Sequence, residues 1–391
     1  MDGGEERDVN DGEKRDMNAG GAGHGQRGGT GRARREKRDV NSGEERDVNG
    51  EGERGVHYEE ERVMDGGEER DVNGRGGTSR EGRGGADMIV VTGATGNAGS
   101  QVVRALAARG ERVRAFVRDP GRARQVLGED AELAVGDFAD AASVRAALEG
   151  ADALLLSCAD DPRRVGWETA AIDAAVAAGV RRIVKLSAAA AEPGSPVAFW
   201  DWHGQVEQYL RSCGTDWVIL RASWYMSNVL AAASAVAAEG RLYAPAGQAR
   251  IAMIDPRDVG AAAAAVLCSP GHGGSPGHGA SAGHEGQTYL LTGPRAITYD
   301  EVAAGLSAAT RSRVEFVDVP GDAAYQAMIG DGMPGFVAEQ IVAMFARLRQ
   351  GAAAQVSPDV EALTGSAPRD FACFATDHAR LFAPAAAAAR R

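Results

Sequence analysis

The chain has 391 residues and a formal net charge of −12, from 43 basic and 55 acidic side chains. Residues 1–87 hold 23 of the acidic and 16 of the basic groups and contain no Leu, Ile, Phe, Trp, Pro or Cys. Such a segment cannot bury enough apolar surface to offset its chain entropy, so we expect the folded core to begin near Met88. The weakly acidic core gives no reason to expect nucleic acid as a partner. No apolar run is long enough to span a bilayer, and the N-terminus lacks the apolar stretch of a secretory signal.

The first 87 residues contain an imperfect repeat. The hexamer EERDVN at 5–10 recurs in similar form at 13–18, 36–41, 44–49 and 68–73. Each copy supplies only one Val or Met, which disfavours a solenoid. Two interpretations remain: a disordered low-complexity tail, or repetitive upstream sequence included through a mis-assigned start. We favour the second because a strand-like segment opens directly at Met88, and we expect 383–391 to be a short C-terminal tail.

The four cysteines are widely spaced and form no CxxC pair. This pattern indicates neither a zinc ribbon nor a disulfide framework. Reduced thiols are typical of a cytosolic protein, so we predict a cytoplasmic location and no metal centre.

From Met88 onward, short apolar runs alternate with Ala-rich helical stretches. Strands are predicted over 88–93, 111–117, 131–137, 151–157, 181–187 and 216–222. Helices are predicted over 97–109, 120–127, 141–148, 169–178 and from near 200 to 211. Strands separated by helices of this length indicate right-handed crossovers and an α/β fold with a doubly wound parallel sheet. We therefore assign a Rossmann domain to residues 88–240.

The second part of the core is less regular. We expect strands over 241–245, 249–255, 287–293 and 313–320, and helices over 256–268, 299–309, 322–329, 335–350 and 369–382. Thr298 and Glu301 have the spacing of a capping box for the helix at 299. These elements suggest a smaller α/β substrate domain over 241–382, interleaved with the Rossmann sheet. Residues 269–286 form a Gly/Ser/His stretch with His272, His278 and His284, for which a flexible surface insertion is favoured over a metal tract.

A dinucleotide-binding turn is predicted where the first strand meets the first helix. Its sequence, TGATGNAG, occupies residues 92–99. Small residues allow a tight turn, and the free N–H groups at a helix N-terminus attract a pyrophosphate. The strand, turn and helix context that this motif requires is present. The candidate cofactor-binding residues here are Gly93, Thr95, Gly96, Asn97, Ala98 and Gly99.

The end of the second strand bears on the choice of dinucleotide. An acidic residue there would bind the ribose hydroxyls of NAD, whereas an arginine accommodates a 2′-phosphate. Arg118 comes first and Asp119 begins a helix, so NADP(H) is preferred over NAD(H). In the alternative interpretation Arg118 is merely solvated and Asp119 is a helix N-cap. Further along, Asp137 and Phe138 are expected beside the adenine, and Ser157 on the nicotinamide side.

The sequence lacks the catalytic motif of an ordinary short-chain alcohol dehydrogenase. That chemistry needs Tyr-x-x-x-Lys, but the only lysines are Lys14, Lys37 and Lys185, and position 181 is Arg. Lys185 lies in a predicted strand and is expected to be structural. His203 is the candidate proton relay. The predicted substrate pocket, beyond the carboxyl ends of the fifth and sixth strands, comprises Trp200, Trp202, Trp224, Tyr225 and Asn228. The tryptophans could equally serve to pack a lid against the core.

At several separated places the chain resembles the NmrA-like family of atypical short-chain dehydrogenases. The resemblance rests on TGATGNAG, on VRDP at 117–120, and on His203, Glu207 and Leu210. It continues in Ile219–Arg221 with Asn228, in IDPRDV at 254–259 and in LTGP at 291–294, and it covers 88–382. The family implies a Rossmann domain with a small C-terminal substrate domain. Some members reduce quinones or azo compounds with NADPH, whereas others bind the dinucleotide and report redox state to a partner.

We therefore predict an NAD(P)H-dependent oxidoreductase that passes hydride to a quinone-like or other conjugated small-molecule acceptor. Such an acceptor needs no dedicated protein acid, because solvent can protonate the product. The alternative is a non-catalytic redox sensor that acts through a protein partner, in keeping with the absence of the lysine that many reductases of the wider group carry near His203. We expect the chain to bind the small-molecule acceptor and not a membrane. We also expect it to be a monomer or homodimer.

Overall fold

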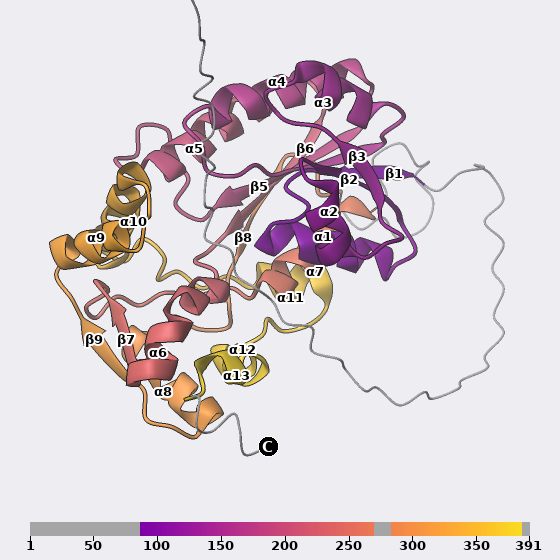
Figure 1. The fold of residues 1–391 in the computed structure, drawn as a ribbon. Coiled ribbons are helices and arrows are strands. Elements are labelled where there is room, and N and C mark those ends of the chain that lie inside the picture. The colour runs from indigo at the N-terminus through magenta and orange to yellow at the C-terminus, as the bar shows by residue number, and fades with distance from the viewer. Residues whose placement is uncertain (1–86, 270–282, 385–391) are drawn as a thin grey trace, which may run out of the picture. The chain divides into compact units, whose positions relative to one another are not determined.

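Seven strands form one parallel sheet in the order β3-β2-β1-β4-β5-β6-β8 (Figure 1). The description covers residues 87–269 and 283–384 of a computed structural model. The strands are β1 (Met88–Val91), β2 (Arg112–Val117), β3 (Glu132–Val135), β4 (Ala153–Leu156), β5 (Arg182–Ala188), β6 (Asp216–Ala222) and β8 (Gln287–Leu291). Every adjacent pair is parallel, which requires crossover connections between successive strands. The predicted Rossmann-like α/β fold is confirmed.

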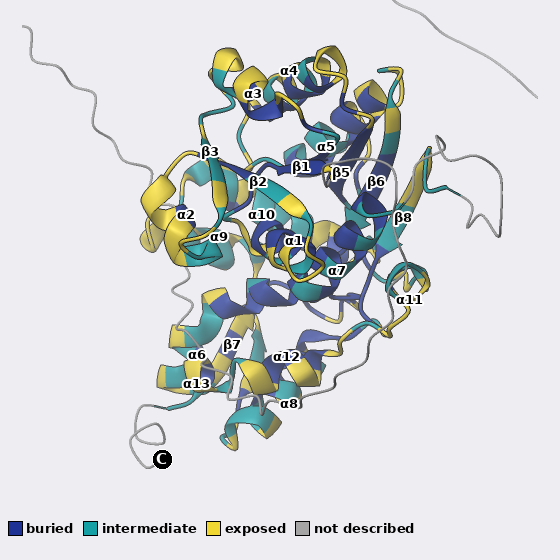
Figure 2. Cartoon of the chain, turned by 90° about the vertical axis from the view of Figure 1, so that its right-hand side faces the viewer, coloured by how far each residue is buried: buried dark blue, intermediate teal, exposed yellow. Residues whose placement is uncertain are grey.

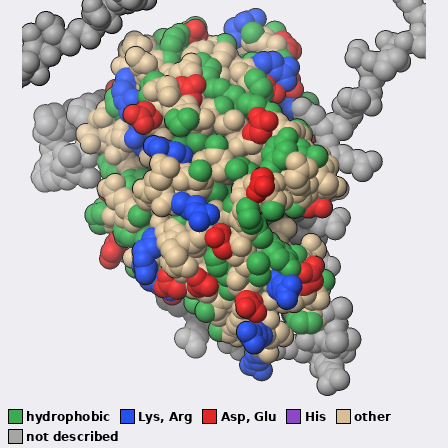
Figure 3. Space-filling view, turned by 90° about the vertical axis from the view of Figure 1, so that its left-hand side faces the viewer, with side chains coloured by type: hydrophobic (Ala, Val, Ile, Leu, Met, Phe, Trp, Pro, Cys, Tyr) green, Lys and Arg blue, Asp and Glu red, His purple; other side chains and the backbone are tan. Residues whose placement is uncertain are grey.

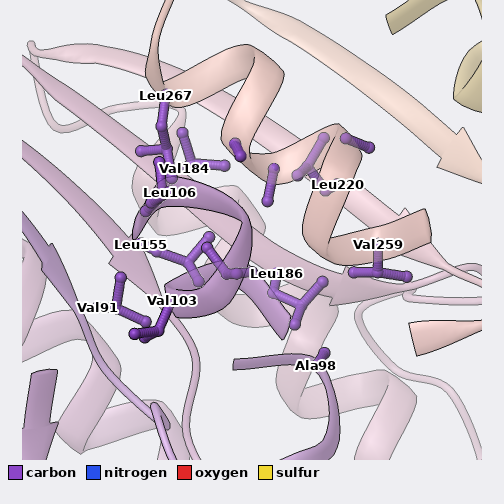
Figure 4. Close-up of a cluster of buried hydrophobic side chains, with 14 of the residues drawn as sticks. Val91, Ala98, Val103, Leu106, Leu155, Val184, Leu186, Leu220, Val259 and Leu267 are labelled. Atoms are coloured by element: carbon purple, nitrogen blue, oxygen red, sulfur yellow. The ribbon is translucent and has the colours of Figure 1, made fainter. Parts of the chain in front are cut away.

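Helices cover both faces of this sheet. Apolar residues of α1 (Asn97–Ala107), α2 (Pro120–Leu127) and α7 (Pro256–Leu267) pack on one face. Figure 4 shows part of this cluster, with Val103 and Leu106 of α1 near Leu155 of β4. The other face is covered by α3 (Ala141–Leu148), α4 (Arg164–Ala177) and α5 (Ala198–Leu210). Because both faces are covered, strands β1, β4 and β5 are almost entirely buried, as Figure 2 shows for β1 and β5.

A second apolar cluster lies outside the seven-stranded sheet. It is built by η1 (Met226–Ala232), α6 (Ala233–Glu239), β7 (Arg241–Ala244), α8 (Tyr299–Thr310), β9 (Glu315–Asp318), α10 (Gly335–Leu348), α12 (Phe371–Asp377) and α13 (Ala379–Phe382). Strands β7 and β9 pair with each other, whereas β8, which lies between them in the sequence, joins the large sheet. Helix α9 (Gly321–Gly330) precedes α10, and α11 (Asp359–Thr364) packs near α7 and β8. The proposed domain boundary at residue 240 stays a prediction.

Several predicted elements differ from the structure. Helix α4 begins at Arg164 rather than near Thr169, and the predicted helix over 369–382 is interrupted at His378. Residues 249–255 form only isolated bridges, Tyr225 with Ile254 and Ile251 with Ile297, because no neighbouring strand lies along them. Helices α6 and α11 were not predicted. The capping box is confirmed: Thr298 accepts a bond from the Glu301 N–H, and Glu301 accepts one from the Thr298 N–H.

In Figure 3, basic and acidic side chains are interspersed with hydrophobic ones, so neither sign forms a continuous surface on that face. Among the described residues, no helix combines the length and apolar character needed to cross a bilayer. Within those same residues, no group of three or more His, Cys, Asp or Glu side chains is placed to hold a metal ion. The tails and most of the 269–286 stretch, including His272 and His278, lie outside the described residues.

Candidate cofactor and acceptor site

The glycine-rich turn joins β1 to α1 in a conformation that requires glycine. Gly93 has φ +62°, a left-handed value that side chains disfavour. A Cβ on Gly99 would lie 2.1 Å from the Gly93 carbonyl oxygen, so the first turn of α1 packs directly on the backbone of the turn. These two glycines therefore let the backbone approach closely at the position where a dinucleotide-binding turn needs it.

Thr92 fixes this turn to the end of β4. Its hydroxyl oxygen accepts a 2.8 Å hydrogen bond from the Ser157 N–H and lies 3.1 Å from the Leu155 carbonyl oxygen, to which it can donate. A Cβ on Gly93 would also meet the Ser157 carbonyl oxygen at 3.0 Å. Ser157, predicted from its position after the fourth strand, is thus held against the turn.

The N-terminus of α1 is suited to an anion. Its N-cap residue is Gly96, no side chain caps it, and its first turn contains no acidic residue. Gly96 and Asn97 are exposed, whereas Ala98 and Gly99 are buried. The first N–H groups of a helix lack intrahelical partners and carry the positive end of the helix dipole. The turn thus offers backbone donors without a competing carboxylate.

At the end of β2, Arg118 and Asp119 have different roles. The Asp119 carboxylate accepts hydrogen bonds from the N–H groups of Gly121 (2.8 Å) and Arg122 (3.1 Å), which makes it the N-cap of α2. Arg118 is exposed. Asp161 lies in the loop before α4. Its pKa is lowered mainly by a hydrogen bond from Arg163 and also by the charge of Arg118. The carboxylate beside Arg118 in sequence is therefore already used by the helix, while the guanidinium stays at the surface.

Asp137 and Phe138 follow β3 and are both half-buried. The Asp137 carboxylate accepts a 2.8 Å bond from the Ala139 N–H. The Phe138 ring packs edge-on against Phe116, with centroids 5.6 Å apart, and lies nearly parallel to Trp167 at 6.5 Å. Trp167 was not singled out from the sequence, because it lies before the predicted start of its helix.

The segment after β6 reaches the glycine-rich turn. Asn97 donates a 3.3 Å hydrogen bond from Nδ2 to the hydroxyl of Ser227 in η1. Tyr225 and Asn228 are half-buried in the same segment, and the Tyr225 carbonyl accepts a bond from the Asn228 N–H. Trp224 packs against Phe345 of α10, with ring centroids 5.3 Å apart. The structure therefore brings three of the five predicted pocket residues into the segment that contacts the turn.

Trp200 and Trp202 have a different environment. Both belong to a cluster that joins the start of α5 to α10, and the ring of Trp202 stacks on Phe336 with centroids 5.8 Å apart. Trp200 is 8% exposed. These contacts match the packing interpretation of the two tryptophans.

His203 lies on α5 among positive charges. Its Nδ1 is buried and has no hydrogen-bond partner among the described residues. Burial lowers the pKa of His203 well below its usual value, and the charges of Arg164, Lys185 and Arg221 lower it further. The lowered pKa favours the neutral imidazole, which is a poorer proton donor than the imidazolium.

Beside His203 lies a buried ionic network that the sequence did not reveal. Lys185 Nζ is 2.9 Å from Glu168 Oε1, and both side chains have 0% exposure. Arg164 is 3.2 Å from Glu168 and 2.6 Å from Asp160. Burial lowers the pKa of Lys185 to about 8, although Glu168 opposes this shift. The only sequence indication of this network was a lysine between the apolar residues Val184 and Leu186.

Cys158 and Ser223 are two further residues at this edge of the sheet. Burial, with a contribution from Glu168, raises the pKa of Cys158 to about 12, so its thiol stays protonated. Ser223 directly follows β6 and is 5% exposed. Its N–H donates to the Leu291 carbonyl, but its hydroxyl has no partner among the described residues. A buried hydroxyl without a partner is costly, which marks Ser223 as a candidate contact for a bound polar group.

Comparison with known proteins places this site in a family. The sequence profile of the NmrA-like family matches residues 85–371. The chain is 36% identical to an NAD(P)H azoreductase of Xenophilus azovorans over 298 residues, which cover 76% of this chain and 100% of that protein. It is 38% identical to a (4-alkanoyl-5-oxo-2,5-dihydrofuran-3-yl)methyl phosphate reductase of Streptomyces griseus, with the same coverage.

A solved structure shares the fold as well as the sequence. The NADPH-dependent quinone oxidoreductase of Escherichia coli, determined in complex with NADPH, superposes with a TM-score of 0.65 at 29% identity. The match covers 74% of this chain and 99% of that one. The resemblance noted in the sequence is confirmed: the chain belongs to the NmrA-like family.

Proposed function

We propose that the chain is an NADP(H)-dependent reductase that transfers hydride to a quinone-like or other conjugated small-molecule acceptor. The observation that carries the proposal is the turn formed by Gly93 and Gly99, which leaves the N-terminus of α1 open beside Ser157. Two curated relatives with 36% and 38% identity are reductases, and a related structure is that of an NADPH-dependent quinone oxidoreductase. Both facts support an oxidoreductase.

The residues at the turn fit a dinucleotide. The close backbone packing of Gly99 on Gly93 leaves no Cβ in the way, and the uncapped first turn of α1 supplies donors for a pyrophosphate. Arg118 would hold a 2′-phosphate, since Asp119 is already bonded to α2. Asp137 and Phe138 would contact the adenine, and Ser157 would border the nicotinamide. When bound, NADPH supplies the hydride.

The side chains near the proposed acceptor favour a reaction without a protein acid. His203 is neutral, and burial raises the pKa of the Tyr225 phenol, so neither is a ready proton donor. A conjugated acceptor suits this site because solvent can protonate its reduced form. Trp224, Tyr225 and Asn228 would form the wall against which a flat acceptor lies. The buried Ser223 hydroxyl, which has no partner among the described residues, would donate a hydrogen bond to one of the acceptor's polar atoms.

The experiment is NADPH oxidation by the purified chain with a panel of quinones and azo compounds. Acceptor-dependent turnover is the expected result. Tight NADP(H) binding without turnover for any acceptor would contradict the reductase proposal and favour the alternative, a sensor that acts through a protein partner.

A binding comparison tests the cofactor preference. Arg118→Ala should weaken NADPH binding much more than NADH binding, because only NADPH has the 2′-phosphate. Arg145→Ala, which removes an exposed arginine from α3, is the matched control and should change neither. Equal losses of NADPH and NADH affinity in Arg118→Ala would refute the role given to Arg118.

A further inference from the structure

Trp167 and Phe138 form one aromatic surface from two separate elements. Trp167 lies on α4 and Phe138 follows β3, yet their rings are within 19° of parallel with centroids 6.5 Å apart. Phe138 is fixed in turn by its edge-on contact with the buried ring of Phe116. The orientation of this surface is therefore set by the core beneath it.

A cation and a carboxylate complete the surface. The Arg163 guanidinium carbon lies 4.4 Å from the centroid of the Trp167 ring, within the range of a cation–π contact. Arg163 is paired with Asp161 at 2.8 Å, and the lowered pKa of Asp161 reflects this bond and the nearby charge of Arg118. Phe138, which packs on Trp167, follows β3, and Arg118 follows the adjacent parallel strand β2, so both lie at the same edge of the sheet.

The helix that carries Trp167 is anchored by the residues next to it. Arg164 and Glu168, one turn apart, form the buried pair that reaches Lys185 in β5. Arg163, the N-cap residue of α4, and Trp167 have the same spacing but lie one residue earlier, next to the buried pair around the helix. The Arg163 side chain is 66% exposed, and Trp167 is half-buried. The buried ion pairs of Arg164 and Glu168 thus fix the position of α4 and of the half-buried Trp167 indole.

We propose that Trp167, together with Phe138, forms the wall against which the adenine of NADP(H) stacks, with Arg163 keeping the indole in that orientation. The inference rests on the proposed function, because it concerns the same cofactor. Aromatic side chains bind nucleobases through their faces, and this contact adds substantially to affinity. Trp167 would therefore be a binding residue for the adenine end of the cofactor, with no part in hydride transfer.

The test measures binding of NADPH and of adenosine 2′,5′-bisphosphate, which lacks the nicotinamide. Trp167→Ala should weaken both by roughly tenfold, in line with the contribution of base stacking. Reduced nicotinamide mononucleotide, which lacks adenine, should bind with unchanged affinity. Trp217→Ala is the matched control: Trp217 also lies under an arginine, Arg211 at 5.6 Å, but at the opposite, amino end of the sheet. It should leave all three affinities unchanged.

The outcomes are distinguishable. Wild-type affinities for NADPH and the bisphosphate in folded Trp167→Ala would overturn the inference, and so would an equal loss for the mononucleotide. If the wild-type chain binds neither NADPH nor the bisphosphate, the proposed function itself fails. Phenylalanine variants give a second test that preserves packing. The bisphosphate should change the tryptophan emission of wild type and Trp217→Phe but not of Trp167→Phe; an undiminished change in Trp167→Phe would also overturn the assignment.

Discussion

Lys185 and Glu168 form an ion pair of 2.9 Å in which neither side chain has any solvent exposure. The pair joins the middle of β5 to α4, and Arg164 extends it to Asp160 at the surface. Burying two charges is expensive, and their attraction offsets that cost only while both partners are present. The pair therefore makes the position of α4, and of Trp167 on it, sensitive to single substitutions.

Glu168→Gln should lower the free energy of unfolding by about 3–5 kcal/mol, since it leaves the Lys185 ammonium buried without a counter-charge. Urea unfolding measures the change. In the double variant Glu168→Gln/Lys185→Met, most of the lost stability should return, because no unpaired ammonium remains. The control is Glu315→Gln, which breaks the exposed Arg313–Glu315 pair and should change stability by less than about 1 kcal/mol. Additive effects of the two buried substitutions would contradict the proposed coupling.

The lowered pKa of Lys185 predicts a stability change in alkaline solution. Its pKa falls from 10.5 to about 8 in the folded state, mainly through burial. Between these values the unfolded chain holds a proton that the folded chain has released, so this residue makes stability rise with pH. The rise is lost as the pH falls back toward 8. Comparing unfolding of wild type and Lys185→Met from pH 7.5 to 10 tests this, and parallel curves would show that Lys185 does not titrate as described.

The lowered pKa of His203 predicts how the stability of the fold changes in acidic solution. Its folded-state pKa is well below the ordinary value of 6.5, so as the pH falls past 6.5 only the unfolded chain takes up a proton at this residue. Stability should therefore decrease below pH 6.5, and the decrease should be smaller in His203→Gln. Thermal unfolding at pH 7.5 and 5.5 measures the difference. The pH profile of any reductase activity between 6 and 8 should be the same in both proteins; a limb present only in wild type would show that His203 does transfer a proton.

Gly99→Ala should damage both folding and cofactor binding. Its Cβ would lie 2.1 Å from a backbone oxygen of Gly93, which forces the turn and α1 apart. We expect a loss of roughly 1–3 kcal/mol in stability, the range for overpacking, together with weaker NADPH binding. Gly330→Ala on α9 is the control, because nothing lies within 4 Å of its Cβ. Thermal unfolding and NADPH titration measure both effects, and wild-type NADPH affinity in Gly99→Ala would argue against the turn as the pyrophosphate site.

The sequence alone was sufficient for the parts of the protein whose physics is local. The apolar run at 88–91, the glycines of the turn and the helix that follows are neighbours in the chain, so their pattern predicts the strand, turn and helix directly. The same holds for the capping box at Thr298, whose two hydrogen bonds span only three residues. The alternation of short apolar strands with helices was enough to predict the parallel sheet.

The tertiary structure decided what depends on contacts between distant segments. Trp200 and Trp202 lie in the first turns of α5 at the expected edge, but the packing of α10 against them could not be inferred from their own neighbourhood. The run at 249–255 has a strand-like pattern, yet no adjacent strand accompanies it.

For the charged residues, too, the sequence gives their positions, whereas the tertiary structure decides their partners. The sequence shows that Lys185 lies between the apolar residues Val184 and Leu186, but it does not show that Lys185 is paired with Glu168, 17 positions earlier. Whether a buried charge is tolerated depends on the partner that the fold brings to it. Trp167 illustrates this for the site: its own sequence context gave no signal, and only the ring of Phe138, carried by a different element, makes it a candidate for the adenine wall.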